Sequence, residues 1–296
     1  MKTPVSHPRI NLEFDAIGTS WNIELGTTQK TAERVSRLLA ARIQEFDKTY
    51  SRFRPDSWVQ KVGTNPGKHT VPKDFKPLYD LYKKLYAKTD GAVTVLIGDA
   101  MERAGYNSTY SLTPSAMQNI PKMNQTLVLE GNTLHVKYPC VIDVGAAGKG
   151  YLVDILGQLL AKEGITDFVI DAGGDIMHRS PAPSTPVTIG LENPYDSSQA
   201  IGVVNLNNQA ICGSSITRRA WADMHHIINA NSLEPVRDTV ATWVIAPTAL
   251  IADGLATALF FVDPATLATD FAFEYVILKT DKSVRHSSHL AGELFT

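Results

Sequence analysis

A glycine-rich turn at residues 143–151 constrains the fold of this 296-residue chain more than any other feature. Its sequence is DVGAAGKGY. It follows an apolar run at 141–144, which predicts the end of a buried strand, and precedes an apolar periodic stretch at 151–162, which predicts a helix. Small residues let backbone amides approach an anion, the helix start adds partial positive charge, and Lys149 adds a full charge. The turn therefore indicates a phosphate or diphosphate site or, equally well, a tight turn with a solvated lysine.

The chain does not follow the pattern of the common nucleotide-binding folds. The glycine spacing is neither the Walker motif nor the Gly-x-Gly-x-x-Gly fingerprint. The expected strands and helices alternate without a regular βαβ rhythm, which favours an α+β fold over a doubly wound sheet. We expect a flexible N-terminal arm at residues 1–13. Residues 14–296 should form one compact mixed sheet-and-helix unit, with or without an inserted lobe. Helices are expected at 29–47, 76–88, 151–162 and 250–261, and strands at 20–26, 125–138 (a hairpin around Gly131 and Asn132), 141–144, 168–170, 187–191, 200–206, 240–246 and 275–278.

Composition excludes several classes of protein. Lys and Arg number 28 against 30 Asp and Glu, and the resulting net charge of −2 argues against a general nucleic-acid-binding surface. The two cysteines, Cys140 and Cys212, cannot form a disulfide scaffold or a four-cysteine metal site. No run of about 18 apolar residues predicts a membrane span, and the polar N-terminus has no apolar segment typical of a secretory leader. We therefore expect a cytoplasmic protein.

A carboxylate and a hydroxyl lie four residues apart in the last predicted helix. Asp253 and Thr257 would face the same way, one helical turn apart, in an otherwise apolar stretch. Oxygen ligands of these two kinds suit a hard cation such as Mg²⁺. The alternative is an exposed Asp253 that stabilises the start of the helix, with Thr257 bonded to the preceding turn.

Two further segments carry candidate site residues. The sequence at 171–175 is DAGGD; it follows a predicted strand, and its glycines either allow close approach of a ligand or simply form a turn. His225 and His226 lie on a candidate strand at 225–228, so at most one of them can face a given site. Either imidazole could act as a base near neutral pH or could be a structural histidine.

The order of these motifs along the chain resembles that of the ApbE family of FAD:protein FMN transferases. The resemblance covers residues 14–261 and consists of short stretches, each of which is a weak signal by itself. Their collinear set is specific. The stretches are IGTSW at 17–21, FDKTYSRFRPDS at 46–57, TDGA at 89–92, DVGAAGKGY at 143–151 followed by Asp154, GGD at 173–175, HII at 226–228 and ADGLATA at 252–258.

The resemblance implies a T-fold-like ApbE fold and the transfer of FMN from FAD to a Ser or Thr of an acceptor flavoprotein, with release of AMP. It implies a Mg²⁺ on the diphosphate, held by Asp253, Thr257 and a main-chain carbonyl near Gly148. Lys149 would neutralise charge and His226 would act as the base, and Phe53 or Trp21 would cover the isoalloxazine. The FAD-binding residues would be Gly18, Thr19, Phe53, Ser57, Gly145, Gly148, Lys149, Gly150, Asp154, Gly173, Gly174 and Asp175.

The chain departs from the family pattern on the acceptor and catalytic side, although Arg218 still matches. Residues 94–96 are TVL where the family has Asp-Pro-Thr, residues 214–215 are SS where it has Ser-Gly, and residues 229–233 are NANSL where it has Asp-Pro-x-Thr-Gly. The chain also has no acceptor stretch of the Ser/Thr-Gly-Ala-Ser/Thr type, so the acceptor would be another protein. Two alternatives stay open: a metal-dependent FAD pyrophosphatase that yields FMN and AMP, and a non-catalytic FAD-binding protein.

Overall fold

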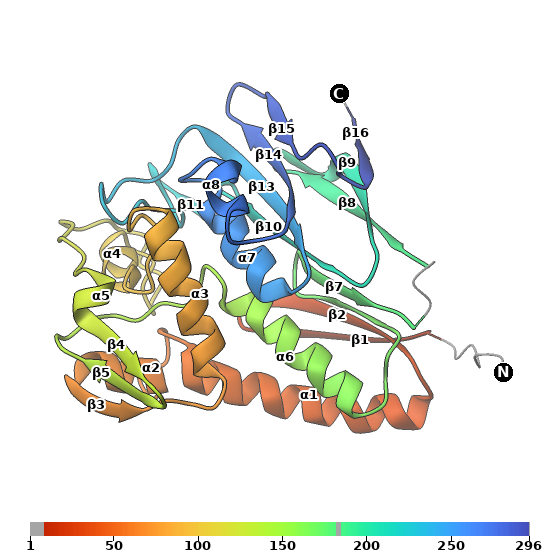
Figure 1. Ribbon diagram of the computed structural model, residues 1–296, viewed down its shortest axis with the longest axis horizontal. Helices are drawn as coiled ribbons and strands as arrows, with labels where there is room; N and C mark the ends of the chain where they lie inside the picture. The colour runs from red at the N-terminus through yellow and green to blue at the C-terminus, as the bar shows by residue number, and fades with distance from the viewer. Residues whose placement is uncertain (1–8, 182–184, 296) are drawn as a thin grey trace.

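The computed structural model describes residues 9–181 and 185–295 and confirms the predicted α+β class (Figure 1). Its centre is an eight-stranded antiparallel sheet with the strand order β1-β2-β6-β7-β10-β13-β14-β15, so that many neighbouring strands come from distant parts of the sequence. The strands are β1 (Arg9–Ala16), β2 (Thr19–Gly26), β6 (Phe168–Asp171), β7 (Asp175–Arg179), β10 (Ala210–Ser215), β13 (Thr239–Ala246), β14 (Glu274–Lys279) and β15 (Val284–His286).

Helices cover one face of this sheet (Figure 1). Alternate strand residues such as Cys212 and Val244 join the buried helix residues in one large apolar core. The first helix shows how the sequence dictates this arrangement, because its apolar residues recur every three or four positions and Thr28 caps its start by accepting a hydrogen bond from Thr31 N. In the described part of the chain, no helix has both the length and the apolar character needed to cross a membrane. The main helices are α1 (Gln29–Tyr50), α3 (Phe75–Lys88), α6 (Gly148–Lys162) and α7 (Ala249–Ala258), and the short α8 (Pro264–Ala268) follows α7.

A second sheet of three strands packs on the other face of the large sheet. It consists of β8 (Val187–Asn193), β9 (Asp196–Leu206) and β16 (Gly292–Leu294), in the order β16-β9-β8. Ile211 and Ile245 of the large sheet pack there against Leu191 and Val204, whereas their chain neighbours face the helices. The molecule thus has three layers, and β8 lies at an edge of the small sheet.

A small lobe lies beside α3 (Figure 1). In it, β4 (Leu127–Glu130) and β5 (Thr133–Val136) form the predicted hairpin, and Gly131 supplies a φ of +57° in its turn. The strand β3 (Gly67–Thr70) pairs with the other side of β5. The helices of this part of the chain are α2 (Trp58–Thr64), α4 (Gly98–Arg103) and α5 (Met123–Thr126).

Residues 9–13, which the sequence analysis assigned to a flexible arm, form the first half of β1. Ile10, Leu12 and Phe14 alternate with exposed residues and pack on the core, and the whole strand pairs with β2. The alternation is weak because every second residue is only half-buried. The rest of the predicted arm, residues 1–8, lies outside the described residues.

The predicted strand at 141–144 is instead an extended connection. The amide of Asp143 donates to Val95 O and that of Cys140 to Gly63 O, but neither acceptor belongs to a strand, so no ladder forms. The candidate strand at 225–228 is also shorter than predicted. Only its first residue is in a strand, β12 (Met224–His225), which pairs with β11 (Ala220–Trp221).

Candidate active site

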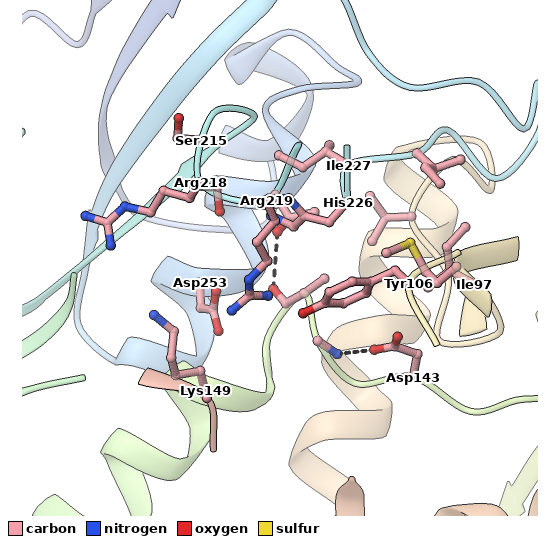
Figure 2. Close-up of a pocket in the computed structure, with 18 of the residues that line it drawn as sticks. Ile97, Tyr106, Asp143, Lys149, Ser215, Arg218, Arg219, His226, Ile227 and Asp253 are labelled. Atoms are coloured by element: carbon pink, nitrogen blue, oxygen red, sulfur yellow. Dashed lines mark hydrogen bonds between the residues drawn. The ribbon is translucent and has the colours of Figure 1, made fainter. Parts of the chain in front are cut away.

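A pocket of about 370 Å³ opens between the start of α6, the helix α7 and the segment that leads from β10 through β12 (Figure 2). The side chains of Lys149, Asp253 and Arg219 point into one space, and Tyr106 and Asp143 lie on its far side (Figure 2). The fold therefore gathers the separate sequence motifs in one place. Of the predicted site residues, Gly18, Thr19, Phe53, Gly145, Lys149, Gly173, His226, Asp253 and Thr257 line this pocket.

Lys149 is held in the pocket wall by a buried ion pair. Its Nζ lies 3.1 Å from Asp175 Oδ2 and donates to Ala172 O at 2.9 Å. Burial raises the pKa of the Asp175 carboxyl even though Lys149 opposes the shift. Burial lowers the pKa of Lys149, but Asp175 and Asp253 more than offset this and the net pKa is raised. Lys149 is thus a fixed positive charge and not a solvated side chain.

Asp253 and Thr257 lie one turn apart on α7, as predicted. Asp253 is only 6% exposed, which excludes the alternative of a solvated residue at the helix start. Its Oδ2 accepts a hydrogen bond of 2.9 Å from Gly150 N. A Cβ atom at Gly150 would clash with Ala249 O and lie 2.6 Å from Asp253 Cβ, so only glycine lets α6 and α7 approach this closely. Burial and the nearby Asp175 raise the pKa of Asp253 well above its usual value.

The carbonyl that faces Thr257 belongs to Ala146, two residues before the predicted Gly148. Thr257 Oγ1 donates to Ala146 O at 3.5 Å. Gly148 does not line the pocket, and as the first residue of α6 its carbonyl belongs to the hydrogen-bond ladder of the helix. The carboxylate, hydroxyl and carbonyl oxygens gathered here suit a hard cation such as Mg²⁺. Over residues 9–181 and 185–295, no cluster of three or more His, Cys, Asp or Glu could hold a metal instead.

The backbone amides of the glycine-rich turn are already bonded within the protein. Gly145 N donates to Asp143 Oδ1 at 2.6 Å (Figure 2), and Ala146 N donates to the hydroxyl of Tyr82 at 3.1 Å. The amides of residues 147, 148 and 150 also have acceptors within the protein. The predicted cradle of free amides is therefore not formed at these residues, and negative charge in the pocket has to be met by side chains and a cation.

The opposite wall carries positive charge that the sequence analysis did not assign to a site. Arg219 lines the pocket, and Arg218 lies at its edge, where it pairs with Glu192 at 2.7 Å. The guanidinium of Arg219 points toward Asp253, whereas that of Arg218 points away (Figure 2). The sequence signals that could have indicated this wall are the two adjacent arginines and the match of Arg218 to the family pattern.

His226 lines the pocket and His225 does not. The ring of His225 bonds to Val236 O and accepts from Ile227 N, so it serves the local backbone. His226 Nδ1 is buried and has no hydrogen-bond partner among the described residues. Burial and the adjacent Arg219 lower the pKa of His226 to about 3, so its imidazole is neutral near neutral pH. A neutral imidazole can accept a proton from a substrate hydroxyl.

Several predicted site residues support the pocket without lining it. Asp154 is buried and accepts hydrogen bonds from Ala249 N and Leu250 N, so it ties α6 to the start of the helix that carries Asp253. Ser57 is buried and caps α2 by accepting a hydrogen bond from the amide of residue 60. The predicted residues that do not line the pocket are Ser57, Gly148, Gly150, Asp154, Gly174 and Asp175.

Of the two aromatic residues predicted to cover the isoalloxazine, Phe53 lines the pocket and Trp21 does not. Trp21 is 1% exposed and belongs to the core. The ring of Phe53 stacks on Tyr110 with a centroid separation of 5.7 Å, and the guanidinium carbon of Arg52 lies 4.1 Å from its centroid. Tyr106, which was not predicted, also lines the pocket. This aromatic wall suits a planar ring system.

Known proteins match this chain in sequence and in fold. The sequence model of the ApbE family matches residues 17–272. This chain belongs to the ApbE family. The protein named FAD:protein FMN transferase in Klebsiella pneumoniae is 25% identical over 279 residues, which cover 86% of this chain and 78% of that protein. Its namesake in Escherichia coli is 24% identical over 274 residues, with the same shares covered. The family membership indicated by the motifs is confirmed.

Solved ApbE structures have the same fold. The ApbE protein of Thermotoga maritima superposes with a TM-score of 0.84 at 22% identity, covering 95% of this chain and 97% of that chain. The flavin transferase ApbE from Vibrio cholerae superposes with a TM-score of 0.79 at 21% identity and the same coverage. The ApbE fold expected from the motifs is therefore confirmed as well.

Proposed function

We propose that this ApbE-family protein is a magnesium-dependent FAD:protein FMN transferase. It would move FMN from FAD onto a Ser or Thr of an acceptor protein and release AMP. The observation that carries the proposal is the convergence of Lys149, Asp253, Thr257 and His226 on one pocket. The names of the curated relatives support the same activity.

FAD would enter this pocket as a substrate, with its diphosphate beside α6 and α7. Asp253, Thr257 and the carbonyl of Ala146 would hold Mg²⁺, whose charge would offset the negative charge that develops on the diphosphate. Lys149 adds a second positive charge, and its ion pair with Asp175 fixes the position of that charge before the substrate arrives. The isoalloxazine would contact the aromatic wall that contains Phe53.

The transfer replaces the phosphoanhydride bond of FAD with a phosphate ester to the acceptor. The acceptor hydroxyl gives its proton to the imidazole of His226, and its oxygen forms a bond to the phosphorus of the FMN half. The bond from that phosphorus to the bridging oxygen breaks, and AMP leaves with this oxygen. The proton then passes from His226 to solvent, so FAD and the acceptor yield FMN-acceptor, AMP and a proton. The lowered pKa of His226 keeps its imidazole unprotonated before each turnover.

The test is to incubate the protein with FAD, Mg²⁺ and a synthetic peptide that contains a Ser-Gly-Ala-Thr segment. We expect flavin fluorescence to remain on the peptide after denaturation and chromatography, together with an equal amount of AMP, and chelation of the metal should abolish both products. Free FMN and AMP with no labelled peptide would instead establish a pyrophosphatase. Intact FAD that stays tightly bound would establish a non-catalytic flavin-binding protein.

A further inference from the structure

A second groove opens beside the candidate active site. It has a volume of about 300 Å³ and is lined by residues of the large sheet and of β8. Part of its lining is shared with the pocket that contains Lys149 and His226, so a molecule in the groove would adjoin a molecule in the pocket. The shared residues are Gly173, Gly213, Ser214, Ser215 and Arg218.

The groove combines apolar side chains with polar ones. Ile176, Ile189, Ile211 and Trp243 line it, and all of these take part in the apolar contact between the two sheets. Three of these four side chains are only half-buried, so the groove offers apolar surface to a ligand. Its charged residues are Asp171, Glu192 and Arg218.

The backbone of β10 has an open edge along this groove. Its first three residues pair with β7, but among the described residues no strand pairs with residues 213–215 on that side, while β13 pairs with them on the other. The N–H and C=O groups of alternate strand residues point to opposite sides. At least one of these three residues therefore presents both groups to the open side. The same three residues line both the groove and the pocket.

Arg218 stands between the two cavities. Its guanidinium points away from Lys149 and Asp253 (Figure 2). It pairs with Glu192 Oε2 at 2.7 Å and lies 3.5 Å from Gly173 O, and both of these partners line the groove. The charge of Arg218 is thus directed to the groove and not to the diphosphate side of the pocket.

We propose that the groove binds the acceptor protein through an extended segment that pairs with the open edge of β10. An apolar side chain of the segment would lie beside Ile189 and Trp243, and its Ser or Thr hydroxyl would enter the pocket toward His226. Main-chain hydrogen bonds give this kind of strand addition its affinity, and contacts with alternate side chains give it specificity. The inference rests on the proposed function, since it names the surface that would dock the acceptor.

A backbone-methylation scan tests the strand pairing without any change to the protein. The probe is the labelled Ser-Gly-Ala-Thr peptide, made in copies that each carry one N-methylated amide, and fluorescence anisotropy gives the Kd of each copy. We expect methylation of alternate amides to raise the Kd about tenfold, and methylation of the amides between them to have little effect. Equal tolerance at every amide would overturn the proposal, as would failure of the unmethylated peptide to bind.

A pair of variants tests the location. Thr217 is exposed and lines the groove but not the pocket, so Thr217→Trp should obstruct the groove alone. Thr188→Trp is the matched control, because Thr188 is exposed on β8 and lines neither cavity. We expect Thr217→Trp to raise the Kd of the peptide about tenfold while FAD affinity is unchanged, and the control to change neither. Equal peptide affinity in the two variants would contradict the assignment.

Separate measurements of binding and transfer distinguish the two ways of failing. If the peptide binds with the alternating sensitivity to N-methylation but no FMN is transferred, the proposed activity is refuted and the docking groove remains. FMN transfer with the same peptide KM in the wild type and in Thr217→Trp would confirm the activity and refute the docking groove.

Discussion

The two walls of the pocket differ in how their side chains are held. On the wall formed by α6 and α7, Lys149 is fixed by its ion pair with the buried Asp175 of β7 and by a hydrogen bond to Ala172 O, and the buried carboxylate of Asp253 is fixed by a hydrogen bond from Gly150 N. On the wall that leads from β10 through β12, Arg218 and Arg219 are exposed side chains of a turn. Buried networks define a single geometry, whereas exposed turn residues rearrange at small cost.

This difference suggests separate tasks for the two walls. The first wall suits a partner of constant shape, a diphosphate with its cation. The second wall suits a partner whose side chains vary, such as an acceptor segment. The departures from the ApbE pattern at residues 214–215 and 229–233 fall on or next to the second wall, whereas the first wall retains Asp253 and Thr257.

Asp253→Asn should have the largest effect and tests whether the first wall holds the cation. The substitution keeps the side-chain shape and removes a charged ligand, so we expect FMN transfer to fall about 1,000-fold and Mg²⁺ affinity to be lost. Transfer rates at increasing Mg²⁺ and calorimetric titration with Mg²⁺ measure the two effects. Thr257→Ser, which keeps a hydroxyl, is the control and should retain most activity. A wild-type rate in Asp253→Asn would place the cation elsewhere.

Lys149 should affect stability as well as binding, because of its ion pair with Asp175. Lys149→Met leaves a buried carboxylate without its partner, and we expect the free energy of unfolding to fall by about 3–5 kcal/mol. The double variant Lys149→Met/Asp175→Asn removes both charges and should recover most of this stability. FAD should bind weakly to both variants, because both lack the positive charge of Lys149. Denaturant unfolding and FAD titration measure the two properties. Restored FAD affinity in the double variant would mean that Lys149 only neutralises Asp175.

The elements that were predicted are those with a strong local pattern. α1 and α7 have buried residues at helical spacing, and β13 is an almost continuous apolar run, so their positions were predicted to within a few residues. β10 was not predicted, because its second half is a glycine and two serines. Its strand state comes from pairing with β13, and such pairing between distant segments is a tertiary property that a local pattern does not encode.

The same reasoning applies to the site. Asp253, Thr257, Lys149 and His226 could be chosen from the sequence because each belongs to a recognisable motif. The sequence could not show that the amide of Ala146 is already hydrogen-bonded. Its acceptor, the hydroxyl of Tyr82, lies 64 residues away in the chain, and only the fold brings the two together. The cytoplasmic location expected from the sequence stays a prediction.

His226 tests the chemistry of the second wall. We expect His226→Ala to lower the rate of FMN transfer about 100-fold, as for the loss of a general base. A base must be unprotonated, and burial together with Arg219 lowers the pKa of His226 to about 3. Protonation of His226 should therefore not limit the rate between about pH 5 and pH 8. Rates at saturating Mg²⁺ and FAD measure this. An acid limb near the usual histidine pKa of about 6.5 that disappears in His226→Ala would contradict the lowered pKa, whereas a wild-type rate in His226→Ala would contradict the role of His226 as the base.

The smallest expected effect concerns Asp154, which supports the first wall from behind. Its carboxylate accepts hydrogen bonds of 2.9 and 2.8 Å from Ala249 N and Leu250 N, yet burial outweighs them and raises its pKa from 3.8 to about 6. A carboxyl group whose pKa is higher in the folded state stabilises the fold most at low pH and loses this contribution as the pH rises through about 6. We therefore expect the free energy of unfolding of the wild type, relative to Asp154→Asn, to fall by roughly 2–3 kcal/mol between about pH 4 and pH 7. Denaturant unfolding of both proteins at each pH measures the difference. A difference that stayed constant would contradict the raised pKa of Asp154. It would mean that the two hydrogen bonds to the carboxylate fully offset the cost of burying its charge, and that they fix α7, and with it Asp253, at no cost in stability.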